Sequence, residues 1–242
     1  NWFYGALASN ERDHPWMDEG MNTYYQKRYE ATKYQNNRLG DDMPKFLSKR
    51  VPTDIESLMD RTLSRIQKSQ PIDTISEAYT STGYGLIVYS KASQWMQKLE
   101  SDLGKSTFDS CMKDYYQQWK FKHPYPNDFK ESIEQNSGKN LIARFQQLHS
   151  TESLDSIQIE RKKKVISFFS LKETNKYNYI SNTPVIGYNS YDKLMFGAAV
   201  HNYQLPLNKL QFFVAPAYAV GSKQLNYTGR VSYNSYQKKS WL

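Results

Sequence analysis

Hydrophobic residues recur at helical spacing through the first 150 residues of the chain. Two stretches show the pattern most clearly, residues 84–100 and residues 106–119. Steps of three and four residues place the hydrophobic side chains of each stretch on one helix face. In the first stretch these residues are Val88, Ala92, Trp95 and Leu99. Residues 1–150 are therefore predicted to be mainly helical.

Four residues are expected to mark helix ends. Ser106 is a candidate N-cap, because its hydroxyl can accept a hydrogen bond from a free backbone N–H of the first turn. Asn127 or Asp128 is expected to cap a further helix in the same way. Gly138 is expected to end that helix, because glycine adopts the left-handed conformation of a helix C-terminus without strain.

The pattern changes after about residue 150. Residues 151–164 are polar and charged and are interpreted as a linker. Beyond them, short runs rich in Tyr, Phe and Val predict strands at 194–200, 212–220 and 229–236, at hairpin-like spacing. The predicted fold is α+β, with a mainly helical domain over 1–150 followed by an antiparallel β-rich segment over 165–242.

Composition and charge narrow the possible classes of protein. The 242-residue chain carries a formal charge of +8, but its basic residues are dispersed, which argues against a nucleic-acid partner. The one dense basic run, Arg161–Lys164, falls in the predicted linker. The single cysteine, Cys111, excludes an intramolecular disulfide and a cysteine-based zinc site.

The N-terminal residues carry the most specific motif. Residues 1–5 read Asn-Trp-Phe-Tyr-Gly, and residues 16–20 read Trp-Met-Asp-Glu-Gly. These runs resemble the aminopeptidase N family of zinc metallopeptidases, the gluzincins. In that family a His-Glu-x-x-His helix is followed by Trp-Phe-Gly, and a Trp-Leu-Asn-Glu-Gly run supplies the third zinc ligand. The resemblance implies a thermolysin-like helical catalytic domain with Glu19 as a metal ligand.

The spacing before Glu19 also matches the family, in which eighteen residues separate the second histidine from the glutamate. Eighteen residues precede Glu19 here, which would place that histidine directly before Asn1. Three protein ligands leave a fourth position on zinc for water. We therefore expect a piece of a larger peptidase that begins just after its His-Glu-x-x-His motif. It would be inactive alone and would use Zn²⁺ only in the intact parent. The alternative for Glu19 is an ordinary surface carboxylate.

A second motif lies seventy residues after Glu19. Residues 89–92 read Tyr-Ser-Lys-Ala and resemble the family's Tyr-x-Lys-Gly run, with Ala92 in place of the usual glycine. The resemblance implies that the hydroxyl of Tyr89 stabilises the oxyanion of the tetrahedral intermediate. The alternative for Tyr89 is a core tyrosine, and Tyr84 is a second, weaker candidate for the catalytic role.

The C-terminal segment is similar to a narrower group. Residues 176–180, 188–195 and 212–216 resemble Bacteroidetes-type homologues in which an outer-membrane-barrel-like segment follows the peptidase. This resemblance implies a location in the cell envelope, in the periplasm or outer membrane. It also implies possible outer-membrane association through residues 165–242. A soluble antiparallel sheet would show the same Tyr-rich strands.

Together these features predict a zinc-dependent aminopeptidase that acts on peptide substrates with metal-activated water. The alternative is a non-enzymatic envelope or surface binding module of vestigial peptidase ancestry. The residues encoded upstream would distinguish the two, because an intact His-Glu-x-x-His motif favours the enzyme.

Overall fold

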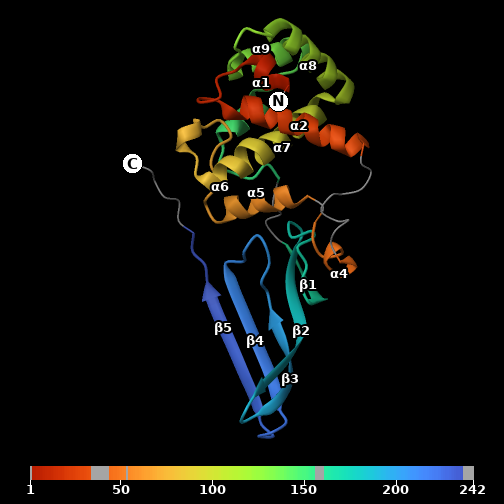
Figure 1. The fold of residues 1–242 in the computed structure, drawn as a ribbon, viewed down its shortest axis with the longest axis vertical. Coiled ribbons are helices and arrows are strands. Elements are labelled where there is room, and N and C mark those ends of the chain that lie inside the picture. The colour runs from red at the N-terminus through yellow and green to blue at the C-terminus, as the bar shows by residue number, and fades with distance from the viewer. Residues whose placement is uncertain (1, 34–43, 53, 156–160, 237–242) are drawn as a thin grey trace. The chain divides into compact units, whose positions relative to one another are not determined.

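The computed structural model divides into two compact units. One comprises Asn1–Asn37 with Lys68–Asp155, and the other comprises Arg38–Gln67 with Ser156–Leu242. The first unit is helical, and the described part of the second combines the helices α4 and α5 with a β-sheet (Figure 1). The structure describes residues 2–33, 44–52, 54–155 and 161–236.

The first unit is built from helices of very different length. Its elements are α1 (Trp2–Leu7), α2 (Pro15–Lys33), η1 (Ser76–Ala78), α6 (Ser81–Gly83), η2 (Tyr84–Lys91), α7 (Ala92–Leu103), α8 (Lys105–Trp119), α9 (Pro126–Ser137), α10 (Ile142–Gln146) and η3 (Gln147–His149). The longest is α2, which begins at Pro15, where the fixed φ of proline suits a first helical residue. Asp18 lies in its first turn.

The element η2 is a π-helix that continues directly into α7. The sequence predicts one α-helix over this stretch, so the helical character is confirmed and the π-type hydrogen bonding is a difference. π-helical stretches are rare in proteins, and many of those that occur lie at functional sites. Gly104, with φ of 83°, separates α7 from α8.

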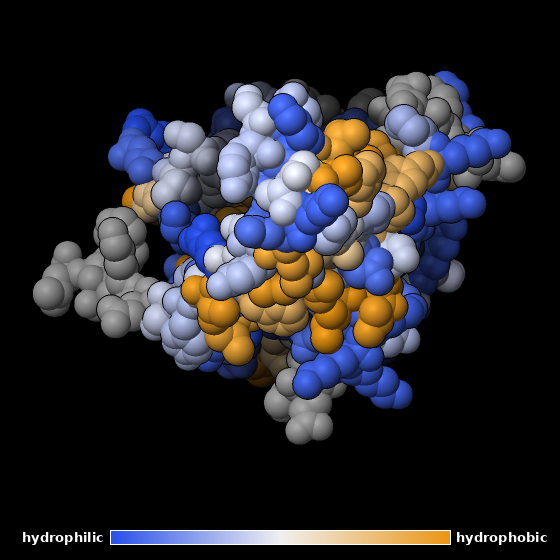
Figure 2. All heavy atoms as spheres, turned by 90° about the horizontal axis from the view of Figure 1, so that it is seen from below, coloured by the Kyte–Doolittle hydropathy of each residue, from blue (hydrophilic) through white to orange (hydrophobic). Residues whose placement is uncertain are grey.

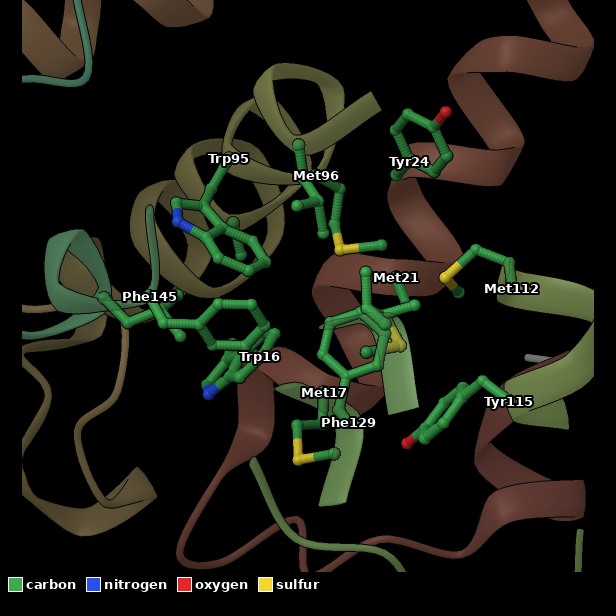
Figure 3. Packing of buried hydrophobic residues seen from close by; sticks show 14 of the residues in the cluster. Trp16, Met17, Met21, Tyr24, Trp95, Met96, Met112, Tyr115, Phe129 and Phe145 are labelled. Carbon is green, nitrogen blue, oxygen red and sulfur yellow. The ribbon is translucent and has the colours of Figure 1, made fainter. Parts of the chain in front are cut away.

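An aromatic cluster forms the core of this unit, as Figure 3 shows. Trp16 of α2 packs edge-on against Trp95 of α7, with ring centroids 5.5 Å apart. Trp95 in turn meets Phe145 at 5.1 Å, and Phe129 meets Tyr115 at 4.8 Å. All five side chains are buried. Their burial fixes α2 against α7, which matters for the site described below.

Two of the expected helix ends differ from the structure. Ser106 lies inside α8, which begins at Lys105 after Gly104. The helix α9 begins at Pro126, and Asp128 is its third residue, where its carboxylate accepts a hydrogen bond from the N–H of Tyr125 at 2.8 Å. Gly138 ends α9 with φ of 67°, as expected.

The second unit contains helices α4 (Lys45–Ser48) and α5 (Ile55–Arg65) and a five-stranded sheet. The strands lie in chain order: β1 (Lys162–Ser167), β2 (Tyr177–Asn189), β3 (Lys193–His201), β4 (Leu210–Ala219) and β5 (Leu225–Tyr233). The three predicted strands overlap β3, β4 and β5, although β5 begins four residues earlier than predicted and ends at Tyr233. The α+β fold class is thereby confirmed.

The sheet departs from the expected antiparallel arrangement at one edge. β1 pairs with β2 in parallel, whereas β2–β3, β3–β4 and β4–β5 pair antiparallel. β1 begins at Lys162, inside the stretch interpreted as a linker. Its three consecutive lysines are exposed, and charged side chains are typical of an edge strand. Residues 38–67 also group with the sheet and not with the helical unit to which the sequence assigned them. Within the described ranges, no helix combines the length and apolar character needed to span a bilayer.

Candidate functional site

Glu19 lies in the second turn of α2, between two buried neighbours. Asp18 and Gly20 on either side are buried, and Glu19 itself is half-buried. The same turn is held in the core by Trp16, so that the backbone of Glu19 belongs to a rigid part of the unit. The Glu19 side chain is thus fixed at its base and only partly buried.

A close approach of two helical segments sets the position of this carboxylate. A Cβ atom built on Gly20 would lie 2.5 Å from the Cβ of Ala92 and 3.2 Å from the carbonyl oxygen of Val88. No side chain at position 20 fits this space without a shift of the backbone. Gly20 therefore lets α2 lie directly against the junction of η2 and α7, the segment that carries Tyr89.

The structure brings Glu19 and Tyr89 together, although seventy residues separate them in the sequence. Burial and the neighbouring Glu19 carboxylate, as hydrogen-bond acceptor and as negative charge, raise the pKa of Tyr89 to about 12. A phenol with that pKa stays protonated at neutral pH. It can therefore donate a hydrogen bond to an acceptor beside Glu19.

Tyr84 lies next to this pair. Its ring centroid is 6.1 Å from that of Tyr89, and its pKa is also raised, by burial and by the negative charges of Glu11 and Glu19. The two tyrosines and the carboxylates thus share one electrostatic environment. Tyr84 remains a second phenol of the site.

Asp18 is a member of the site that sequence reasoning missed. Its Oδ1 accepts a hydrogen bond from the hydroxyl of Ser9 at 2.8 Å, and within the described part of the chain its Oδ2 has no hydrogen-bond partner. Burial raises its pKa to about 6, against the lowering effect of the Ser9 bond. The only signal in the sequence is the departure from the family's Trp-Leu-Asn-Glu-Gly run, in which asparagine stands at this position.

Lys91 fixes the C-terminal end of the π-helix that carries Tyr89. Its side chain is buried, and its ammonium group donates hydrogen bonds to the Ser69 hydroxyl at 3.1 Å and to the Glu152 carbonyl at 2.8 Å. In the Tyr-x-Lys run, Tyr89 thus lies beside Glu19 at the site, whereas Lys91 is buried and anchors the helix to Ser69 and Glu152. This anchor limits the rotation of the helix that would move the phenol.

His14 stabilises the start of α2. Its Nδ1 lies 2.6 Å from Asp73 Oδ1, and the indole N–H of Trp16 donates to the same oxygen at 3.1 Å. These contacts give His14 a structural role. Asp73 thereby also holds Trp16, which packs α2, the helix of Glu19, into the core.

The fit of a metal ion can be examined from these residues. A half-buried carboxylate such as Glu19 is a suitable oxygen ligand for zinc. Across the described ranges, no group of three His, Cys, Asp or Glu side chains is arranged to hold a metal ion. The chain described here thus offers one ligand for a metal site, with a protonated phenol beside it.

A comparison with protein-family models gives one match. The peptidase family M1 domain matches residues 1–150. The chain belongs to peptidase family M1. Both Glu19 and Tyr89 fall inside the matched residues, and all five strands of the sheet fall outside them. A comparison with curated proteins finds no match.

Membership of the M1 family agrees with the resemblance that the two motifs predicted. The M1 domain is a peptidase domain, and the family is generally zinc-dependent. The matched residues include α5, which groups with the sheet in the second compact unit. The M1 domain of this protein is therefore divided between the two units.

Proposed function

We propose that this M1 domain belongs to a zinc-dependent aminopeptidase, in which Glu19 is a zinc ligand and Tyr89 stabilises the oxyanion. The proposal is carried by one observation, the pairing of the Glu19 carboxylate with the Tyr89 phenol across the Gly20–Ala92 contact. Two motifs distant in the sequence meet at one place, which a chance match of either motif does not explain.

Glu19 would hold the metal together with two histidines, which we expect to precede Asn1. When bound, zinc supplies a water of lowered pKa and polarises the substrate carbonyl. The residues of this chain keep the Glu19 carboxylate in place through the burial of Trp16 and the close approach at Gly20. Asp18, beside the ligand, is held by Ser9 and points into the protein.

Tyr89 would act as a hydrogen-bond donor to the oxygen of the tetrahedral intermediate. Its raised pKa supports this role, because the proton stays on the phenol until the oxyanion forms. Loss of one such donor typically costs about 3 kcal/mol of transition-state stabilisation, or at least a hundredfold in kcat. The Lys91 anchor limits the motion of the donor between turnovers.

The first test measures turnover of aminoacyl anilides by a form of the protein that carries the two histidines. Tyr89→Phe should lower kcat by about a hundredfold or more and leave zinc content unchanged. Glu19→Ala should lose zinc and activity together. Tyr84→Phe is the matched control, because it removes a neighbouring phenol that the proposal does not require.

The second test uses the present chain and no metal. The difference between the tyrosinate absorbance titrations of wild type and Tyr89→Phe isolates the titration of Tyr89. Glu19→Gln should move this pKa from about 12 part of the way toward its ordinary value, because burial, the larger cause, remains. An unchanged pKa would separate Tyr89 from Glu19 and remove the basis of the proposal.

Peptide turnover unaffected by Tyr89→Phe would reject the catalytic role, and a parent without zinc or turnover would support the binding-module alternative.

A further inference from the structure

The two faces of the sheet differ in a way that is unusual for a protein surface in water. Alternate strand residues lie on opposite faces, and the cross-strand pairs identify which positions share a face. One face carries the even-numbered residues of 182–188, 194–200 and 210–218 and the odd-numbered residues of 225–233. We call this the apolar face.

The apolar face is exposed and lacks charge. Six of its side chains are between 66% and 85% exposed: Ile186, Tyr188, Leu225, Tyr227, Val231 and Tyr233. No charged residue occurs at the described positions of this face, although charged residues make up 23% of the chain. An exposed apolar surface of this extent marks an interaction site. Figure 2, seen from the hairpin end of the sheet, shows hydrophobic side chains gathered near the viewer.

The opposite face is lined by small and polar residues. Ala199, Ala215 and Ala219 on this face are buried, and the charged residues Lys193 and Arg230 also belong to it. In a soluble antiparallel sheet the large apolar residues cover a core and the polar residues face water. Here the large apolar residues are the ones that the chain leaves uncovered.

Gly197 indicates how the sheet bends. A Cβ at this position would lie 2.0 Å from the carbonyl oxygen of Pro216 on β4. A glycine at such a close backbone approach, inside a strand, is typical of a bend in a sheet. The small residues on this side let the strands draw together here. β3 and β4 therefore approach each other closely on the face opposite the apolar one.

The strand lengths match the thickness of a bilayer. β3 and β5 have nine residues and β4 has ten, and a strand that crosses the hydrocarbon core has about 9–11. A nine-residue strand rises about 30 Å, which a tilt of about 40° reduces to about 23 Å, close to the apolar band of about 25 Å seen in membrane sheets.

We propose that the apolar face of β2–β5 contacts the hydrocarbon of a lipid bilayer. The partner is the acyl chains and not the lipid headgroups, because the face offers no charge for a headgroup. Backbone groups at a sheet edge need partners in hydrocarbon, so additional strands must pair there with β5 and with residues 183–189 of β2, which lie beyond the register of β1. This inference is independent of the peptidase proposal, which rests on the other unit.

Fluorescent labels on two sides of β5 test the proposal with the full chain. Val231→Cys lies on the apolar face and Thr228→Cys on the opposite face, and both positions are exposed. Each variant carries an environment-sensitive label and is mixed with phosphatidylcholine vesicles whose acyl chains are brominated. Zwitterionic lipid removes the electrostatic attraction that a chain of charge +8 would show toward anionic lipid. Cys111 is buried, and labelling of the wild type checks that it does not react.

The expected result is a blue shift and bromine quenching at position 231 and much weaker quenching at 228. Unlabelled Val231→Arg should lower vesicle partitioning by at least about thirtyfold, and Thr228→Arg should not, with circular dichroism confirming an intact sheet in both. Equal, water-like emission at both positions would overturn the proposal. So would shielding of position 231 that grows with protein concentration without lipid, which would assign the face to a second copy of the chain.

Discussion

The helical unit and the sheet use the same kinds of side chain in opposite ways. The helical unit places Trp16, Trp95 and Phe129 in a fully buried cluster, whereas the sheet leaves Tyr227 and Val231 among the most exposed large hydrophobic residues that the structure describes. Composition alone does not separate the two regions, because both are rich in aromatic residues. The difference lies in where the side chains point, and it indicates which medium each surface meets.

Energetically the two arrangements respond differently to water. Burial of a large apolar side chain contributes about 1.5–3 kcal/mol, so the helical cluster stabilises its unit in water without a partner. The apolar face gains nothing of this kind until something covers it.

Truncation of a core aromatic residue should lower the free energy of unfolding far more than the same truncation on the apolar face. Trp95→Ala removes a buried ring that packs on Trp16 and Phe145 and donates to the Arg144 carbonyl at 3.0 Å. We expect a loss of about 3–5 kcal/mol in the free energy of unfolding, measured by urea denaturation in detergent-free buffer. Tyr227→Ala is the control and should change it by less than about 0.5 kcal/mol. Similar losses in both variants would mean that the apolar face is covered within the chain.

The pKa values of two aspartates are shifted in opposite directions from the ordinary value. Burial raises the pKa of Asp18 to about 6, whereas hydrogen bonds from Asn189 and Ser222 hold the pKa of the exposed Asp192 below its usual value. Because folded Asp18 binds its proton more tightly than the unfolded chain does, stability should fall as the pH rises from about 4 to 6. The loss amounts to about 3 kcal/mol above that range.

Asp18→Asn should abolish this loss and stabilise the protein at pH 7, as urea denaturation across the pH range would show. Asp192→Asn should leave the pH dependence between 4 and 6 unchanged, because its pKa lies below that window. If wild-type stability does not fall between pH 4 and 6, Asp18 is ionised in the folded state at little cost, and its burial has been misjudged.

A methyl group at position 20 should test the close approach that pairs Glu19 with Tyr89. Gly20→Ala places a Cβ 2.5 Å from the Cβ of Ala92 and should destabilise the helical unit by about 1–3 kcal/mol. It should also lower the pKa of Tyr89, because the two segments must separate.

Gly85→Ala is the matched control for Gly20→Ala. A Cβ there meets no atom within 4 Å, and the helix should gain about 0.5–1 kcal/mol. Gly20→Ala at wild-type stability and with an unchanged Tyr89 titration would show that the contact is looser than described.

The sequence was sufficient wherever local spacing determines structure. The helical period of residues 84–100, the left-handed glycine at Gly138 and the strands β3–β5 follow from neighbours a few residues apart. The motifs around Glu19 and Tyr89 identified two residues that the fold brings together. For these elements, local pattern and tertiary structure agree.

Other features depend on contacts that no local pattern encodes. The parallel pairing of β1 follows from which strand it meets, and the raised pKa of Asp18 follows from atoms packed around it. The π-helical bonding of η2 changes the register by one residue, and periodicity over eight residues does not resolve that difference. The grouping of residues 38–67 with the sheet likewise depends on tertiary contacts.

Gly20 and Ala92 share the space of a single methyl group. The family's usual residue at position 92 is glycine. In this protein Ala92 carries the methyl group, on the η2–α7 side of the contact. An Ala92→Gly change would free the same space for alanine at position 20. Side chains larger than hydrogen should therefore not occur at both positions together among related proteins. A larger side chain at either position would push α2 away from the segment that carries Tyr89, although Glu19 and Tyr89 themselves stay unchanged.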